Sequence, residues 1–153
     1  TGGALYVYVS DSPTEGRRLY HDICGLARPR IGFITGDGAW SRYQNNAREK
    51  ALRLMWKHKT FGHLTSRESA NEEAGEYGGA VILTGVSDAG LGDDLTILIS
   101  FSGFPPDYDE MLCYLVAERM GWASTGKINS TVLNLASRGK ANWPFLKMRG
   151  MSI

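Results

Sequence analysis

Two histidines near the end of a predicted central helix are candidate ligands for a metal ion. His58 and His63 lie five positions apart, so adjacent turns of the chain could present both imidazoles to one pocket. A neutral imidazole is a good ligand for haem iron. In the structural alternative, His58 interacts with the helix C-terminus and His63 is an ordinary loop residue. The spacing therefore predicts a cofactor-binding and metal site at His58 and His63, with the structural alternative left open.

Basic side chains on the same predicted helix could bind the anionic groups of a ligand. Lys50 and Arg48 precede His58 by two to three turns. Their cationic groups could pair with the carboxylates of a bound molecule. The alternative is a solvated basic face of the helix.

Carboxylates gather where a later helix is predicted to begin. Asp109 and Glu110 follow Asp107 closely, and paired carboxylates can act as acid and base when their pKa values are split. His63 could take part in the same chemistry. The competing interpretation is helix capping, in which Asp107 is the N-cap and Glu110 completes a capping box.

The composition is that of one globular domain. The chain has 153 residues, of which 42% are hydrophobic and 22% charged, and a net charge of +1. We expect a single domain over residues 1–153, with a core at about 5–122 and a C-terminal extension at 123–153. The small net charge argues against a nucleic-acid partner. No apolar run approaches the ~20 residues that a membrane helix needs, so no membrane association is expected.

Two cysteines bear on the cellular compartment. Cys24 and Cys113 stand among apolar residues on predicted helices and show no zinc-binding spacing. We expect buried free thiols, which fit a reducing compartment and a cytoplasmic location.

A hairpin followed by a helix is the clearest structural signal. Apolar runs at 80–86 and 95–101 flank a polar turn at 87–94, and both runs are nearly continuous, which predicts that both faces of the hairpin are covered. The following helix has an apolar stripe from Met111 to Met120, and Gly121 is placed to end it.

The remaining elements complete an α+β pattern. We expect strands at 5–10, 31–35 and 39–43, the last two joined by a turn at 36–38. Helices are expected from Ser12 to about Gly25 and from Asn46 to about Phe61. Residues 66–77 are expected to form a loop or short helix, 128–135 a short helix or strand, and 137–153 a tail packed on the body or on a neighbouring subunit. This order predicts a central antiparallel sheet of about five strands flanked by helices, with a ferredoxin-like topology as the second choice.

Three pieces of the chain, in order, resemble the haem-degrading-domain family that includes GlcG, HbpS and the C-terminal domain of PduO. The first piece is the expected strand–turn–strand at 30–43, with Asp37-Gly38 in the turn. The second is the helix that starts Asn46-Ala47-Arg48-Glu49-Lys50-Ala51 and is followed by Phe61-Gly62 and Thr65. The third is the strand Gly78-Gly79-Ala80-Val81-Ile82, followed by a hairpin, Ser102-Gly103 and Asp109-Glu110. The resemblance covers about residues 17–120. It implies a profilin-like fold, usually in a homo-oligomer, that binds haem, a corrinoid or another small molecule.

Three functions follow as hypotheses. The first is a protein that binds haem or a related tetrapyrrole in a pocket beside the central helix and the last hairpin, through His58 or His63 with Lys50 or Arg48. The second is a small enzyme that acts on a soluble metabolite through Asp109, Glu110 or His63. The third is a structural subunit whose tail at 137–153 locks an oligomer.

Overall fold

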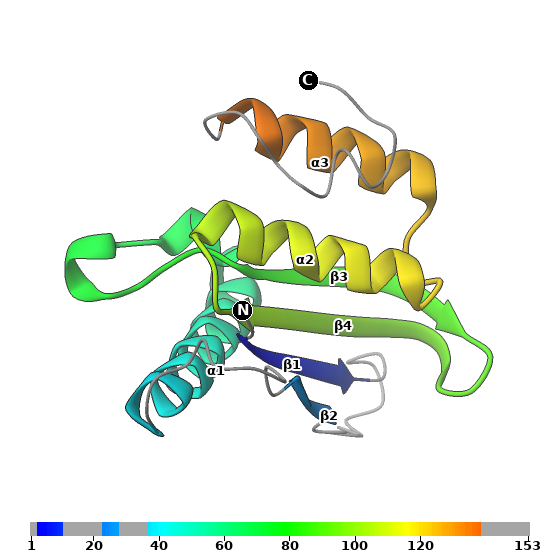
Figure 1. The fold of residues 1–153 in the computed structure, drawn as a ribbon. Helices are drawn as coiled ribbons and strands as arrows, with labels where there is room; N and C mark the ends of the chain where they lie inside the picture. Colours follow the sequence, from blue (N-terminus) through cyan, green and yellow to red (C-terminus); the bar gives the residue numbers. More distant parts are fainter. Residues whose placement is uncertain (1–2, 11–22, 28–36, 139–153) are drawn as a thin grey trace.

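The computed structural model describes residues 3–10, 23–27 and 37–138, which combine strands and helices in an α+β arrangement (Figure 1). The elements, in chain order, are β1 (Gly3–Ser10), β2 (Ile23–Ala27), α1 (Asp37–Phe61), the short 3-10 helices η1 (Ser66–Ser69) and η2 (Glu72–Ala74), β3 (Ala80–Asp88), β4 (Gly92–Ser102), α2 (Pro106–Arg119) and α3 (Thr125–Arg138). None of the helices in these ranges has the combination of length and hydropathy that a membrane span requires.

The four described strands form one antiparallel sheet in the order β2-β1-β4-β3. Ile99 of β4 pairs with Val7 on one side and with Val81 on the other. The strand predicted at 5–10 and the hairpin at 80–101 are confirmed, although the turn between β3 and β4 is shorter than expected. The strand expected at 31–35 lies outside the described residues.

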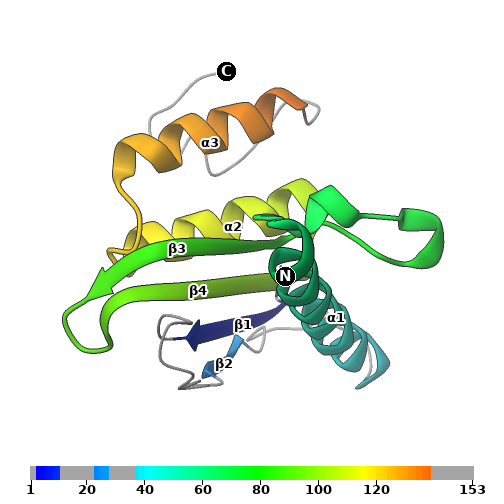
Figure 2. The same cartoon turned by 180° about the vertical axis from the view of Figure 1, so that it is seen from behind.

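Helices cover both faces of this sheet, as the continuous apolar runs predicted. Figures 1 and 2 show α1 across one face at the end where β4 finishes, α2 on the opposite face, and α3 beyond α2. The strand residues alternate between these two sides. Ala80, Ile82 and Leu98 pack with Ala51 and Leu54 of α1. The larger cluster lies on the α2 side and joins Val81, Leu83, Ile97 and Ile99 to Cys113, Ala117 and Trp122.

The segment 36–43 was predicted wrongly from Asp37 onward. Asp37 and Gly38 were expected in a hairpin turn and 39–43 in a strand, but α1 begins at Asp37 and continues without interruption to Phe61. A helix gains one hydrogen bond for each residue added to an existing turn, whereas a hairpin strand needs a partner across a sheet. The strong helix-forming sequence after Asn46 therefore extends backward through residues that individually favour strands.

The helix expected from Ser12 to Gly25 is also wrong at its C-terminal end. Residues Ile23–Ala27 form β2, in which Cys24 pairs with Tyr6 of β1. Residues 11–22 lie outside the described part of the chain. Pairing with β1 thus decided the conformation of this short apolar segment. The local sequence pattern alone does not show whether such a segment forms a strand or a helix.

The outcomes in the C-terminal half concern the start of α2, its end, and the segment at 128–135. Helix α2 begins at Pro106 with Pro105 as its N-cap, so the predicted capping role of Asp107 is wrong. Gly121 has a φ of +76°, as predicted for a residue that ends a helix. The segment at 128–135 is part of helix α3, where Ile128 and Leu135 are buried against Met111 of α2. The tail at 139–153 lies outside the described residues.

Candidate functional site

A buried ion pair joins α1 to α2 at the end of the sheet. Lys50 Nζ lies 2.7 Å from Asp109 Oδ2, and each side chain is 2% exposed. The ammonium also donates to the carbonyl oxygen of Phe101 at 2.9 Å. Asp109 Oδ1 accepts a hydrogen bond of 2.9 Å from the amide of Phe104. One lysine and one aspartate therefore tie together the first helix, the last strand and the loop that leads into α2.

Gly79 makes this close approach of the two helices possible. Its φ is +118°, and a Cβ atom built there would lie 2.6 Å from Asp109 Cβ and 2.9 Å from Lys50 Nζ. Real Cβ atoms do not come that near to other heavy atoms, and this φ is one that residues with side chains rarely adopt. The glycine before β3 is thus part of the structure that holds the ion pair.

A pocket of about 270 Å³ opens above the ion pair. Its lining comes from α1, from one tyrosine before β3, from the end of β4 and the loop after it, and from the first turn of α2: Arg42, Tyr43, Asn46, Lys50, Tyr77, Ser102, Gly103, Phe104, Pro106 and Asp109. Aromatic rings form part of the wall and the charged pair is at the buried side. Half of the lining residues carry charged or polar side chains, so the pocket offers both polar partners and aromatic surface to a ligand.

Burial changes the protonation chemistry of this region. Loss of water around the carboxyl raises the pKa of Asp109 from 3.8 to about 6, although the charge of Lys50 and hydrogen bonds from Lys50 and the amides of Phe104 and Gly103 oppose the change. Burial also raises the pKa of the Cys113 thiol, which donates to the Gly79 carbonyl at 3.3 Å. Asp109 can therefore exchange a proton near neutral pH, whereas Cys113 is held as an unreactive neutral thiol.

Glu110 is directed away from this pocket and binds Arg67. Its Oε2 accepts from Arg67 Nε at 2.8 Å, and the same guanidinium pairs with Asp107. The pair of carboxylates considered for acid–base chemistry is therefore separated, because Asp109 faces Lys50 and Glu110 faces η1. Asp107 and Glu110 were expected to cap the helix together, but both bind Arg67 instead.

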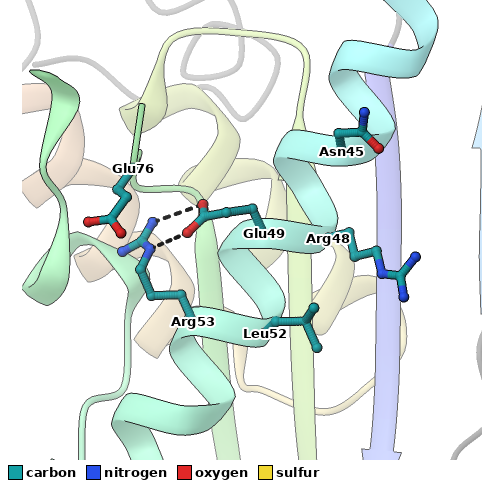
Figure 3. A pocket seen from close by; sticks show the side chains of 6 residues that line it. All are labelled: Asn45, Arg48, Glu49, Leu52, Arg53 and Glu76. Carbon is teal, nitrogen blue, oxygen red and sulfur yellow. Dashed lines mark hydrogen bonds and ion pairs between the residues drawn. The ribbon is translucent and has the colours of Figure 1, made fainter. Parts of the chain in front are cut away.

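Arg48 lines a different and open pocket of about 450 Å³. Figure 3 shows this pocket, with Arg48, Asn45 and Leu52 projecting from the outer side of α1 and the Glu49–Arg53 pair beside Glu76. Arg53 also donates to the carbonyl oxygens of Ser66 and Tyr77, at 2.8 and 2.6 Å. It thereby fastens the segment between α1 and β3 onto the helix.

The two histidines lie together at the C-terminal end of α1. His58 Nδ1 is 2.8 Å from the backbone oxygen of His63, so this ring nitrogen carries the proton and donates. The Nδ1 atom of His63 is buried and has no hydrogen-bond partner in the described structure. The His63 ring lies 5.8 Å from that of Phe61, between centroids. Neither histidine lines either of the two pockets.

The structure thus distributes the predicted site residues over four places, one of which is the contact of Glu110 with Arg67. It brings Lys50 and Asp109 together, and it places Arg48 on the outer face of α1 and the histidines at the end of that helix. Within the described ranges no three His, Cys, Asp or Glu side chains are grouped as metal ligands.

Sequence reasoning missed the pocket residues Arg42, Tyr43, Tyr77 and Phe104. A helical interpretation of 39–46 would have found the first two. Arg42, Asn46 and Lys50 follow one another at intervals of four, and Tyr43 is three residues before Asn46, so all four share one helix face. Tyr77 and Phe104 carry no such local signal.

Searches for similar proteins found no match among protein-family models, curated proteins or solved structures. The geometry of the sites described above is therefore the basis for the function proposed below.

Proposed function

We propose that this protein binds a small molecule in the pocket above Lys50 and Asp109. The observation that supports the proposal is a charged pair buried at the inner end of a partly aromatic pocket. Removing two charges from water is costly, and apolar residues of similar volume often stabilise a fold equally well. A titratable group with a shifted pKa inside a pocket is therefore a marker of function.

Asp109 could also provide chemistry to a bound molecule. With a pKa of about 6, its carboxyl can accept or release a proton in the range where a general acid or base works best. Lys50 would orient the carboxyl through the 2.7 Å contact. This is the form in which the geometry supports the enzyme hypothesis, with Asp109 acting without Glu110 or His63.

A fragment screen on the whole chain tests the binding proposal. We expect small uncharged aromatic fragments at millimolar concentration to shift the backbone amide NMR signals of Gly103 and Phe104, which line the pocket. Asn46→Phe should fill the pocket and weaken this binding at least about tenfold, because the new ring occupies the ligand volume.

Asn45→Phe is the matched control, since Asn45 is the neighbouring residue on the outer face and lines the other pocket. It should leave fragment binding unchanged. The proposal is wrong if no fragment shifts the Gly103 and Phe104 signals, or if the two variants weaken binding equally.

We propose haem as a second candidate ligand, at the histidine end of α1. The observation that favours it is an exposed aromatic surface, because Trp56 and Phe61 are 60% and 63% exposed and Lys57 Nζ lies 5.4 and 5.1 Å from their ring centroids. A tetrapyrrole could pack on these rings with Lys57 near its propionates. The pocket above Lys50 is below the ~300–1,000 Å³ range of sites for drug-sized ligands, so a tetrapyrrole requires a different place.

His58 is the residue best prepared to hold the iron. The hydrogen bond from its Nδ1 to the His63 carbonyl fixes the ring and leaves Nε2 for a metal, which is the usual support for a ligating histidine. A haemin titration followed by Soret absorption should saturate at one haem per chain. His58→Ala should shift or abolish the band. Equal binding by the parent, His58→Ala and His63→Ala would rule this candidate out.

The finer expectations from the family resemblance belong to the same proposal. The resemblance implies a profilin-like fold and a homo-oligomer, whereas a fifth strand is expected from the order of the predicted elements and a cytoplasmic location from the two cysteines. The resemblance is supported by the sequence pieces at 46–65 and 78–110 alone, because the first piece, the strand–turn–strand at 30–43, is helical from Asp37 onward.

A further inference from the structure

The inner end of the pocket offers a charged donor that the described residues do not fully satisfy. An ammonium group has three N–H bonds. Lys50 directs one to Asp109 Oδ2 and one to the carbonyl of Phe101, and the described residues provide no third acceptor. Lys50 is 2% exposed and lines the pocket, so a ligand atom in the pocket is the natural partner of the third N–H.

The remaining charges of the pocket favour an anion. The two carboxylate oxygens of Asp109 already accept from Lys50 and from the Phe104 amide. Arg42 lines the same pocket, and its guanidinium lies 5.7 Å from the ring centroid of Tyr43 and forms no ion pair with the described residues. Lys50 and Asp109 balance each other, so Arg42 makes the pocket positive overall.

The volume of the pocket and its lining residues restrict the chemical class of the ligand further. A volume of about 270 Å³ corresponds to roughly nine water molecules at ~30 Å³ each. Tyr43, Tyr77 and Phe104 present aromatic surface, which packs well on a flat ring. Planar carboxylates are the anions whose geometry an arginine fork matches in a bidentate manner.

We propose that the ligand of this pocket is a small aromatic carboxylate, with its carboxylate on Lys50 Nζ and the Arg42 guanidinium and its ring on Tyr43, Tyr77 and Phe104. This inference rests on the proposed binding function and specifies its ligand class. The two cations come from one face of α1, at positions 42 and 50, and the aromatic residues come from three separate segments.

The test uses four probes on the whole chain, followed through the amide signals of Gly103 and Phe104. Benzoate has the ring and the charge, benzamide has the ring without the charge, acetate has the charge without the ring, and benzylammonium has the opposite charge. We expect benzoate to bind about tenfold or more tighter than each of the other three, since both the charge and the ring contribute. Arg42→Gln should weaken benzoate about tenfold and leave benzamide unchanged.

Arg48→Gln is the matched control, because Arg48 is an exposed arginine of α1 outside this pocket. It should change none of the affinities. Benzamide or benzylammonium binding as tightly as benzoate, or benzoate binding unaffected by Arg42→Gln, overturns the anion assignment while the pocket stays a binding site. Acetate binding as tightly as benzoate overturns the aromatic assignment. If none of the probes shifts the Gly103 and Phe104 signals, the proposed function fails as well.

Discussion

Replacing Lys50 by methionine should reduce the free energy of unfolding by about 3–5 kcal/mol at pH 8. The substitution keeps a long apolar side chain but leaves the Asp109 carboxylate buried without its cation, and an unpaired buried charge is strongly destabilising. The Phe101 carbonyl also loses its donor. Denaturant unfolding followed by circular dichroism measures the change.

At pH 5 the same substitution should cost less. Because burial raises the pKa of Asp109 from 3.8 to about 6, the folded chain holds this proton more tightly than the unfolded chain does. The stability that the neutral carboxyl contributes is therefore complete below about pH 4 and is lost as the pH rises through 6. Removing Lys50 raises the pKa of Asp109 further, so the difference between variant and parent grows from pH 5 to pH 8.

Two controls separate the ion pair from the general effect of losing a lysine. Lys59→Met changes an exposed lysine of the same helix and should alter stability by no more than about 0.5 kcal/mol. In an Asp109→Asn background, Lys50→Met should cost less than in the parent, because no buried negative charge remains. Equal costs in both backgrounds at pH 8 would contradict the role of the pair.

Gly79→Ala should reduce the free energy of unfolding by about 3 kcal/mol or more. The alanine must adopt a φ of +118°, and its methyl group would lie 2.6 Å from Asp109 Cβ. Backbone strain alone costs of order 1–3 kcal/mol at such a position, and the collision adds to it. The displaced ion pair should also weaken fragment binding in the pocket.

Gly75→Ala provides the comparison. Gly75 has a positive φ of +75° but open space around it, so that substitution tests backbone strain without a collision. It should cost about 1–2 kcal/mol and leave fragment binding unchanged. Equal destabilisation by the two substitutions would show that contact with the ion pair does not matter at Gly79.

The parts of the fold that sequence analysis predicted correctly depend on neighbouring residues. The β3–β4 hairpin follows from two apolar runs joined by a short polar turn, and the end of α2 follows from Gly121. These signals lie within a few residues of the structure that they determine. The failures at 37–43 and 23–25 occur where a segment with strand or helix propensity was decided by an adjoining helix or by a partner strand.

The candidate site was also predicted only in part from the sequence. Lys50 and Asp109 were each identified from the sequence, Lys50 as a partner for ligand carboxylates and Asp109 as a possible acid or base. They are 59 residues apart in the chain, and no local pattern relates them. The sequence therefore pointed to the residue types without revealing that they bind each other.

The sequence by itself determined the α+β class, the hairpin and the helix that follows it, because hydrophobic periodicity and turn residues act over short distances. Tertiary structure alone decided that Lys50 and Asp109 form a buried pair. It also decided that Glu110 binds Arg67 instead of facing the same pocket as Asp109. The shared pocket of Arg42, Tyr77 and Phe104 is a third result of the packing. These arrangements arise because α1, α2 and the end of β4 pack against one another around Gly79. The pKa of Asp109 depends on that packing, since it is burial that removes the water around its carboxyl.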